Sequence, residues 1–167
     1  LLGGLRVLLA YELANGGQLS IINRLDRETS GLVLVAKNRL AAAALGRAFA
    51  KREVGKEYLA VVVGWPEREN WRVDAPLRRL GEVAESKSWV RQCVAPGGRP
   101  AVTGFRVLKR FERGGKRFSL LHCEPETGRM HQIRAHLEHA GHPVVGDKIY
   151  GGDGSCYLEF IEGGWTA

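Results

Sequence analysis

Cysteine is scarce in this sequence, with three residues among 167, at positions 93, 123 and 156. An odd number of widely spaced cysteines argues against a disulfide framework and favours a reducing, cytoplasmic setting. Long apolar runs are also lacking, because no segment approaches the roughly 20 residues that a membrane-spanning helix needs. The first residues do not show the basic-then-apolar pattern of a signal peptide. We therefore expect a cytoplasmic protein with no membrane partner.

The signatures of several common enzyme classes are missing as well. The sequence contains no Gly-x-x-x-x-Gly-Lys-Ser/Thr phosphate loop, no dinucleotide-binding fingerprint after a strand and no Gly-x-Ser-x-Gly nucleophile elbow. Four histidines lie within twelve positions, at 131, 136, 139 and 142. They lack the Cys-x-x-Cys pair or the two-histidine helix with its glutamate that typically bind zinc. A metal-dependent hydrolase built on these histidines is therefore the weaker alternative, and we expect no metal.

Positive charge, by contrast, is in excess. Lysine and arginine number 25 against 18 aspartate and glutamate residues, which gives a net charge of +7. This excess of positive charge suits a polyanionic partner, since basic side chains that neutralise phosphates release counterions. A soluble basic protein without such a partner would have the same excess. Hydrophobic residues make up 44% and charged residues 26% of the chain, as is ordinary for a globular protein. The length allows one domain with a core, so we expect residues 1–167 to form a single domain.

The hydrophobic periodicity predicts helices that alternate with strands. Apolar stripes at helical spacing predict helices at residues 5–13, at 39–52 and from Gly128 to Gly141, the last with Thr127 as a candidate cap. Alternating or β-branched apolar runs predict strands at 31–37, 56–65, 86–94, 103–112 and 117–124. The last two strands flank a Gly-Gly turn that is typical of an antiparallel hairpin. This order predicts an α+β fold with a mixed, largely antiparallel central sheet flanked by helices.

A first polar cluster that could carry chemistry lies just before the strand predicted at 31–37. In it, Asp26 stands between Arg24 and Arg27, and nearby positive charge favours the ionised form of a carboxyl group. An ionised, positioned carboxylate can act as a nucleophile or as a base, and a loop held by a strand is a common place for it. From the local pattern alone, a polar turn in which Asp26 and Thr29 form local hydrogen bonds is the stronger interpretation.

A second polar cluster lies on the helix predicted from Gly128. His131 and Arg134 are three residues apart and share one side of this helix, away from its apolar stripe. Such a face near a helix start suits an anion site, and a solvated helix face is the alternative. The following segment, residues 141–151, is rich in turn-forming residues, and we interpret it as architectural, with Asp147 as a candidate loop anchor.

Taken together, these segments resemble the RluA-type family of RNA pseudouridine synthases. Residues 24–31, Arg-Leu-Asp-Arg-Glu-Thr-Ser-Gly, resemble the catalytic motif of the family. Residues 56–64, Lys-Glu-Tyr-Leu-Ala-Val-Val-Val-Gly, resemble the strand that carries its active-site tyrosine. Residues 127–137, followed by Gly141-His142-Pro143 and Gly146-Asp147, resemble its third motif. The resemblance covers residues 20–152, and three long motifs in the family's order and at suitable separations are hard to explain by coincidence.

The resemblance implies an isomerase that converts specific uridines of ribosomal or transfer RNA to pseudouridine. Asp26 would be the nucleophile and would attack the sugar C1′ or the base C6 of a flipped-out uridine. Tyr58 would pack against the flipped base, and Arg134 would pair with Asp26 and hold its carboxylate. The residues expected to contact RNA are Arg24, Arg27, Arg129 and His131. A relative of the family that binds RNA without catalysis is the alternative function.

The resemblance also implies partners and departures from the family pattern. We expect RNA as the partner, ribosomal RNA first and transfer RNA next, a monomeric protein, and no cofactor, since the isomerisation involves no redox step or hydrolysis. Asn23 stands where the family usually has histidine, which removes a ring from that position and leaves the nucleophile in place. We also expect a fold truncated at both ends, with no RNA-binding domain of the S4 type and a C-terminal part cut short after Gly151.

Overall fold

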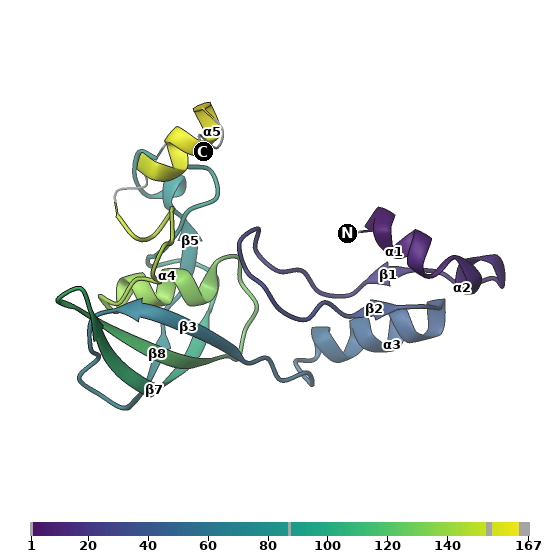
Figure 1. Cartoon of the computed structure of the whole chain (residues 1–167), viewed down its shortest axis with the longest axis horizontal. Helices are drawn as coiled ribbons and strands as arrows, with labels where there is room; N and C mark the ends of the chain where they lie inside the picture. The colour runs from purple at the N-terminus through teal and green to yellow at the C-terminus, as the bar shows by residue number, and fades with distance from the viewer. Residues whose placement is uncertain (1, 87, 153–154, 164–167) are drawn as a thin grey trace. The chain divides into compact units, whose positions relative to one another are not determined.

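The computed structural model describes residues 2–86, 88–152 and 155–163. The chain divides into two units, Leu1–Val54 and Gly55–Ala167, whose elements are labelled in Figure 1. The positions of the two units relative to one another are not determined. The single domain expected over residues 1–167 therefore stays a prediction.

The first unit is built on a short hairpin followed by a helix. Its elements are α1 (Leu2–Leu8), α2 (Ala10–Ala14), β1 (Ser20–Ile21), β2 (Val35–Ala36) and α3 (Arg39–Ala50). Strands β1 and β2 pair antiparallel. Helix α3 begins after Asn38, whose side-chain oxygen accepts the N–H of Ala41 at 2.8 Å and satisfies a donor that the helix itself cannot. The strand predicted at 31–37 is wrong in length, because only its residues 35 and 36 have strand partners on β1.

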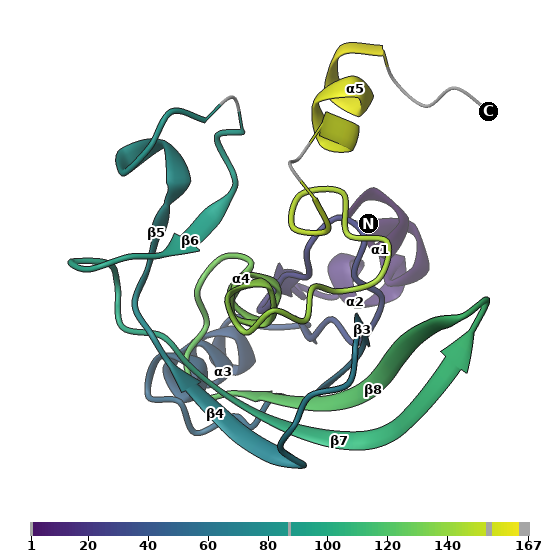
Figure 2. The same cartoon turned by 90° about the vertical axis from the view of Figure 1, so that its left-hand side faces the viewer.

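The second unit contains a four-stranded antiparallel sheet with the order β3-β8-β7-β4, seen with α4 beside it in Figure 2. Its elements are β3 (Tyr58–Val63), β4 (Asn70–Asp74), β7 (Val102–Arg113), β8 (Lys116–Pro125) and α4 (Gln132–His139). Strands β7 and β8 form the predicted hairpin. Gly114 and Gly115 connect them with φ angles of 57° and 69°, a left-handed backbone that suits a two-residue hairpin turn.

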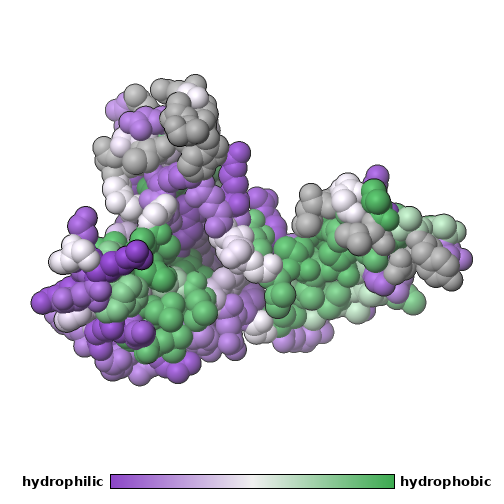
Figure 3. All heavy atoms as spheres, in the orientation of Figure 1, coloured by the Kyte–Doolittle hydropathy of each residue, from purple (hydrophilic) through white to green (hydrophobic). Residues whose placement is uncertain are grey.

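Helix α4 covers one face of this sheet. Its Leu137 is fully buried in a core cluster with Val62 of β3, Phe105 of β7 and Leu121 of β8. Burial of each such side chain contributes about 1.5–3 kcal/mol, so this face fixes the helix against the sheet. On the other face, alternate residues of β3 are exposed, and Figure 3 shows hydrophobic surface over this part of the unit.

A smaller two-stranded sheet lies between β4 and β7 in the order of the chain. Its strands are β5 (Leu77–Arg79) and β6 (Gln92–Val94), with the short helix η1 (Leu80–Glu82) after β5, and α5 (Ser155–Gly163) is the last helix. The strand predicted at 86–94 is limited to its last three residues. All the described strand pairs are antiparallel, and with the helices they confirm the α+β class. Among the described residues, no helix has the length and apolar character needed to span a bilayer.

Candidate functional site

Asp26 lies in the loop that joins β1 to β2. Its backbone carbonyl accepts the N–H of Thr29 at 3.0 Å, which closes a tight turn over the two residues between them. Asp26 itself is half-buried, whereas Arg24 and Arg27 are exposed. The backbone turn that the alternative interpretation expected is therefore present, and Asp26 lies at its start with an exposed arginine on either side in the sequence.

Asn23 holds the two sides of this loop together. Its Nδ2 donates to the carbonyl of Leu32 at 3.1 Å, and its Oδ1 accepts the N–H of Leu34 at 2.7 Å. The N–H of Ile22 donates to the carbonyl of Leu34 at 2.9 Å, so the contacts of Asn23 extend the pairing of β1 with β2. An amide side chain has both the donor and the acceptor that this requires. Asn23, at the position of the family's usual histidine, thus supports the loop that carries Asp26.

Tyr58 is the first residue of β3 and lies opposite Cys123 of β8. Its half-buried side chain packs against the core cluster that contains Leu137 of α4. Two residues before it, Lys56 donates from Nζ to the carbonyl of Thr127 at 3.0 Å. The structure therefore brings the tyrosine strand and the segment before α4 to the same face of the sheet. The sequence pattern assigns no role of its own to Lys56.

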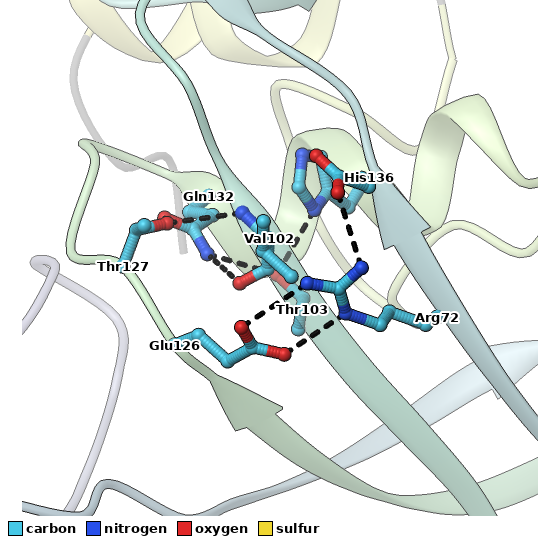
Figure 4. Close-up of polar contacts among 8 residues, drawn as sticks. Arg72, Val102, Thr103, Glu126, Thr127, Gln132 and His136 are labelled. Carbon is cyan, nitrogen blue, oxygen red and sulfur yellow. Dashed lines mark hydrogen bonds and ion pairs between the residues drawn. The ribbon is translucent and has the colours of Figure 1, made fainter.

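A chain of buried hydrogen bonds fixes the start of α4 (Figure 4). The helix begins at Gln132, four residues later than predicted, and Thr127 does not cap it. Instead the Thr127 hydroxyl donates to Oε1 of Gln132 at 2.6 Å and accepts the N–H of Val102 at 3.1 Å. Nε2 of Gln132 donates to the carbonyl of Val102 at 2.8 Å and to the hydroxyl of Thr103 at 2.9 Å. Every buried polar group in this part of the network has a partner, which rigidifies the segment.

The network continues into the helix through His136, whose side chain is fully buried. Nε2 of His136 lies 3.0 Å from the carbonyl of Ala75 and Nδ1 lies 2.9 Å from the hydroxyl of Thr103. Because a carbonyl only accepts, Nε2 carries the proton and Nδ1 accepts from Thr103. Burial lowers the pKa of His136 despite the hydrogen bond to Ala75. His136 is therefore a neutral structural residue.

This burial should make the protein less stable at acid pH. An unfolded histidine titrates near about pH 6.5, whereas the pKa of folded His136 is lower. Well above about pH 6.5, His136 is neutral in both the folded and the unfolded chain, so it does not make the free energy of unfolding depend on pH. As the pH falls below about 6.5, the unfolded chain takes up a proton that the folded chain does not, and the free energy of unfolding should fall by at most about 1.4 kcal/mol per pH unit.

Denaturant titrations between pH 7 and pH 5 measure this effect. The variant His136→Asn should show a shallower dependence of its unfolding free energy on pH than the wild type. His139→Asn, at an exposed position of the same helix, serves as the matched control and should change the slope less than His136→Asn does. Equal slopes for the wild type and His136→Asn would show that His136 is not the titrating group.

Arg134 forms a buried ion pair with Asp147. Nε of Arg134 donates to Oδ2 at 2.6 Å and Nη2 donates to Oδ1 at 2.8 Å, and the two side chains are 21% and 4% exposed. Asp147 Oδ1 also accepts the N–H groups of Ile149 and Tyr150 at 2.9 and 3.1 Å. Burial alone would raise the pKa of Asp147, but these hydrogen bonds and the charge of Arg134 hold it below its ordinary value. Asp147 is therefore a loop anchor, as predicted.

Tyr150 connects this pair to the start of α4. The N–H of Gln92 donates to the Tyr150 hydroxyl at 2.8 Å, and the hydroxyl lies 3.0 Å from Nδ1 of His131. The hydroxyl hydrogen can then go to Nδ1, which makes Nδ1 the acceptor. His131 precedes the helix with a left-handed backbone, φ 54° and ψ 21°, which is uncommon for a residue other than glycine. Tyr150 and His131 therefore hold each other in place.

The residues predicted to form the site fall in both units. Asp26, Arg24 and Arg27 belong to the first unit, and Tyr58, Arg129, His131 and Arg134 belong to the second. Within the second unit, Arg134 and His131 both contact Tyr150, and Arg129 donates from Nε to the carbonyl of Pro100 at 3.0 Å. The pairing of Arg134 with Asp26 would join the units and stays a prediction.

The histidines proposed as an alternative metal site have other contacts in the second unit. His142 donates from Nδ1 to the carbonyl of Val63 at 3.0 Å, and His136 takes part in the buried network. Among the described residues, the one group of three potential metal ligands is Glu57, His122 and Glu124, whose ligand atoms lie within 4.8 Å of one another. This group does not include the four clustered histidines on which the alternative depended.

Comparison with known proteins agrees with the motifs. A family model described as RNA pseudouridylate synthase matches residues 5–139. This chain is 43% identical over 142 residues to an uncharacterized RNA pseudouridine synthase of Chloroflexus aurantiacus, covering 84% of this chain and 42% of that protein. It is 42% identical over 142 residues to the ribosomal large subunit pseudouridine synthase D of Nitrosomonas europaea, covering 85% of this chain and 38% of that protein.

The fold is also similar to that of a solved structure. Human RNA pseudouridylate synthase domain containing 1 matches with a TM-score of 0.76 and 30% sequence identity, over 92% of this chain and 62% of that one. The regions matched in the two bacterial relatives are 42% and 38% of those proteins, so this chain spans less than half of their length.

Proposed function

This chain belongs to the RNA pseudouridylate synthase family, and from that premise we propose that it isomerises uridine to pseudouridine in RNA with Asp26 as the nucleophile. The observation that carries the proposal is that the family match spans residues 5–139 and so includes Asp26, Tyr58 and Arg134. The turn that presents Asp26 and the buried pair that holds Arg134 support the roles given to these two residues.

The reaction needs no group beyond the side chains proposed for it. A uridine within folded RNA must leave its stack before it can be reached, and Tyr58 offers a ring on which the flipped base can stack. Asp26 attacks the sugar C1′ or the base C6, and the bond between N1 and C1′ breaks. The uracil turns within the pocket and rejoins C1′ through C5. As C5 joins C1′, the bond from Asp26 to the sugar or the base breaks and the free carboxylate is restored. The C5 proton then leaves to solvent, and N1 takes up a proton.

The substrate proposed is ribosomal RNA. The relative from Nitrosomonas europaea is described as a ribosomal large subunit pseudouridine synthase and is 42% identical to this chain. The net charge of +7 favours association with the phosphate backbone. Arg24, Arg27, Arg129 and His131 are the side chains proposed to contact the RNA. Transfer RNA is the second choice among substrates.

Mapping the modified positions tests this proposal. The full chain is incubated with unmodified transcripts of large-subunit ribosomal RNA and of transfer RNA, and pseudouridines are located as carbodiimide adducts that stop reverse transcription. We expect new stops at one or a few uridines of the ribosomal transcript. Stops in transfer RNA alone would move the substrate to that class. RNA binding without stops in either transcript would favour the non-catalytic alternative.

A further inference from the structure

The guanidinium group of Arg134 is held from two directions by side chains that follow α4. In the plane of the group, Asp147 accepts from Nε and Nη2 at 2.6 and 2.8 Å. The guanidinium carbon also lies over the ring of Tyr150, 4.9 Å from the ring centroid. A bidentate carboxylate fixes the in-plane orientation of an arginine, and an aromatic face restricts its tilt. The two contacts therefore limit different rotations of the same group.

Asp147 and Tyr150, together called the arginine clamp below, are themselves immobilised. Asp147 accepts two backbone N–H groups of its own loop, from Ile149 and from Tyr150. Tyr150 is 1% exposed, and its hydroxyl bonds to the backbone of Gln92 in β6. Each member of the clamp thus has partners besides Arg134. A group held by such fixed neighbours does not need to be ordered during the reaction.

We propose that Asp147 and Tyr150 are positioning residues that clamp Arg134 and so fix its guanidinium in the orientation that the isomerisation requires. The inference rests on the proposed function, because that function includes Arg134 among the residues of the reaction. Neither clamp residue touches the substrate, and both act through Arg134. The family match ends at residue 139, before either of them.

A comparison of rate with affinity tests the positioning role. Asp147→Asn and Tyr150→Leu should lower the rate of tritium release from uridine C5 at saturating RNA by roughly 10- to 100-fold, as a displacement of about 1 Å does, and change the dissociation constant for the RNA by less than about threefold. Tyr150→Phe keeps the ring against Arg134 and removes only the hydroxyl, so it should lose less of the rate than Tyr150→Leu does. Asp74→Asn, in an exposed pair with Arg72, is the matched control for Asp147→Asn. A loss confined to affinity, or equal losses in Tyr150→Phe and Tyr150→Leu, would overturn the role.

A second measurement does not depend on activity. Arg134→Ala removes the guanidinium and leaves its site between the clamp residues, so ethylguanidinium at millimolar concentration should raise the Tm of this variant saturably. The rise should be lost when Asp147→Asn is added and weakened when Tyr150→Leu is added. Equal rises in Tm in the single and double variants would overturn the clamp.

Failure of the proposed function would look different. A wild-type chain that binds RNA without releasing tritium would overturn the proposed function and the positioning role with it. The ethylguanidinium measurement would still show whether Asp147 and Tyr150 bind the guanidinium.

Discussion

Asp26→Asn is expected to lower the rate of uridine isomerisation on the order of 10⁴-fold or more, the size of loss that follows when an enzyme loses its nucleophile. The amide has the shape of the carboxylate but lacks the charge with which to attack the sugar or the base. The loop should keep its fold, because its two sides are joined by Asn23 and by the pairing of β1 with β2. RNA affinity should change little, since other side chains are proposed to contact the RNA.

Single-turnover tritium release and a binding titration with the same RNA separate these two quantities. Glu53→Gln is the matched control, because Glu53 lies in the same unit as Asp26 and its pair with Lys51 is exposed and 3.9 Å long. It should keep the wild-type rate. A loss of less than about tenfold in Asp26→Asn would contradict the nucleophile assignment.

The second large effect is on stability: Asp147→Ala should lower the free energy of unfolding by about 3–5 kcal/mol, the cost of removing one partner of a buried ion pair. The substitution leaves the largely buried guanidinium of Arg134 without its carboxylate. It also removes the acceptor of the N–H groups of Ile149 and Tyr150, and unsatisfied buried donors add to the cost. The loop that follows α4 should therefore loosen together with Arg134.

Denaturant unfolding of the two variants Asp147→Ala and Asp74→Ala measures the difference. Asp74 also pairs with an arginine, at 3.1 Å, but its side chain is 62% exposed. An exposed pair of this kind contributes about 0–1 kcal/mol, so Asp74→Ala should unfold close to the wild type. Similar losses in the two variants would show that burial of the Arg134–Asp147 pair does not decide its contribution.

The elements that sequence predicts well are those with a local signal. The β7–β8 hairpin combines alternating strands with Gly114 and Gly115, whose left-handed φ angles are those the turn requires. Helix α3 was predicted at 39–52 and is found at Arg39–Ala50, because it is rich in alanine and its cap, Asn38, adjoins it. In both cases the residues that determine the element lie within it or beside it.

The elements that the pattern missed depend on partners far away in the chain. Strand β4 pairs with β7, from Asn70 opposite Arg106 to Asp74 opposite Val102. Its five residues alternate polar and apolar side chains, but so short a pattern does not by itself distinguish a strand from a loop. The start of α4 is delayed because Gln132 bonds to Thr103 and Thr127 across the buried network. Such bonds are decided by tertiary packing, which overrides the local preference for a cap.

The candidate site likewise contains residues that the sequence predicts and contacts that it does not. The motifs were enough to nominate Asp26, Tyr58 and Arg134, because catalytic motifs are short and continuous. The contacts that hold Arg134 were not predictable from spacing, since Asp147 and Tyr150 follow it by 13 and 16 positions in a glycine-rich loop. The available signal was an acidic residue three positions before a tyrosine, and its meaning depends on a fold that sequence patterns alone do not specify.

Release of hydrogen from uridine C5 tests the proposed isomerisation most directly, because the carbon that loses this hydrogen is the one that joins the sugar. Ribosomal RNA transcribed with uridine tritiated at C5 is incubated with the wild-type chain, and the tritium in water and the nucleosides of the digested RNA are measured together. The account predicts tritium release that is matched, one for one, by pseudouridine in the RNA. A folded chain that binds the RNA but releases no tritium from ribosomal or transfer RNA would contradict it.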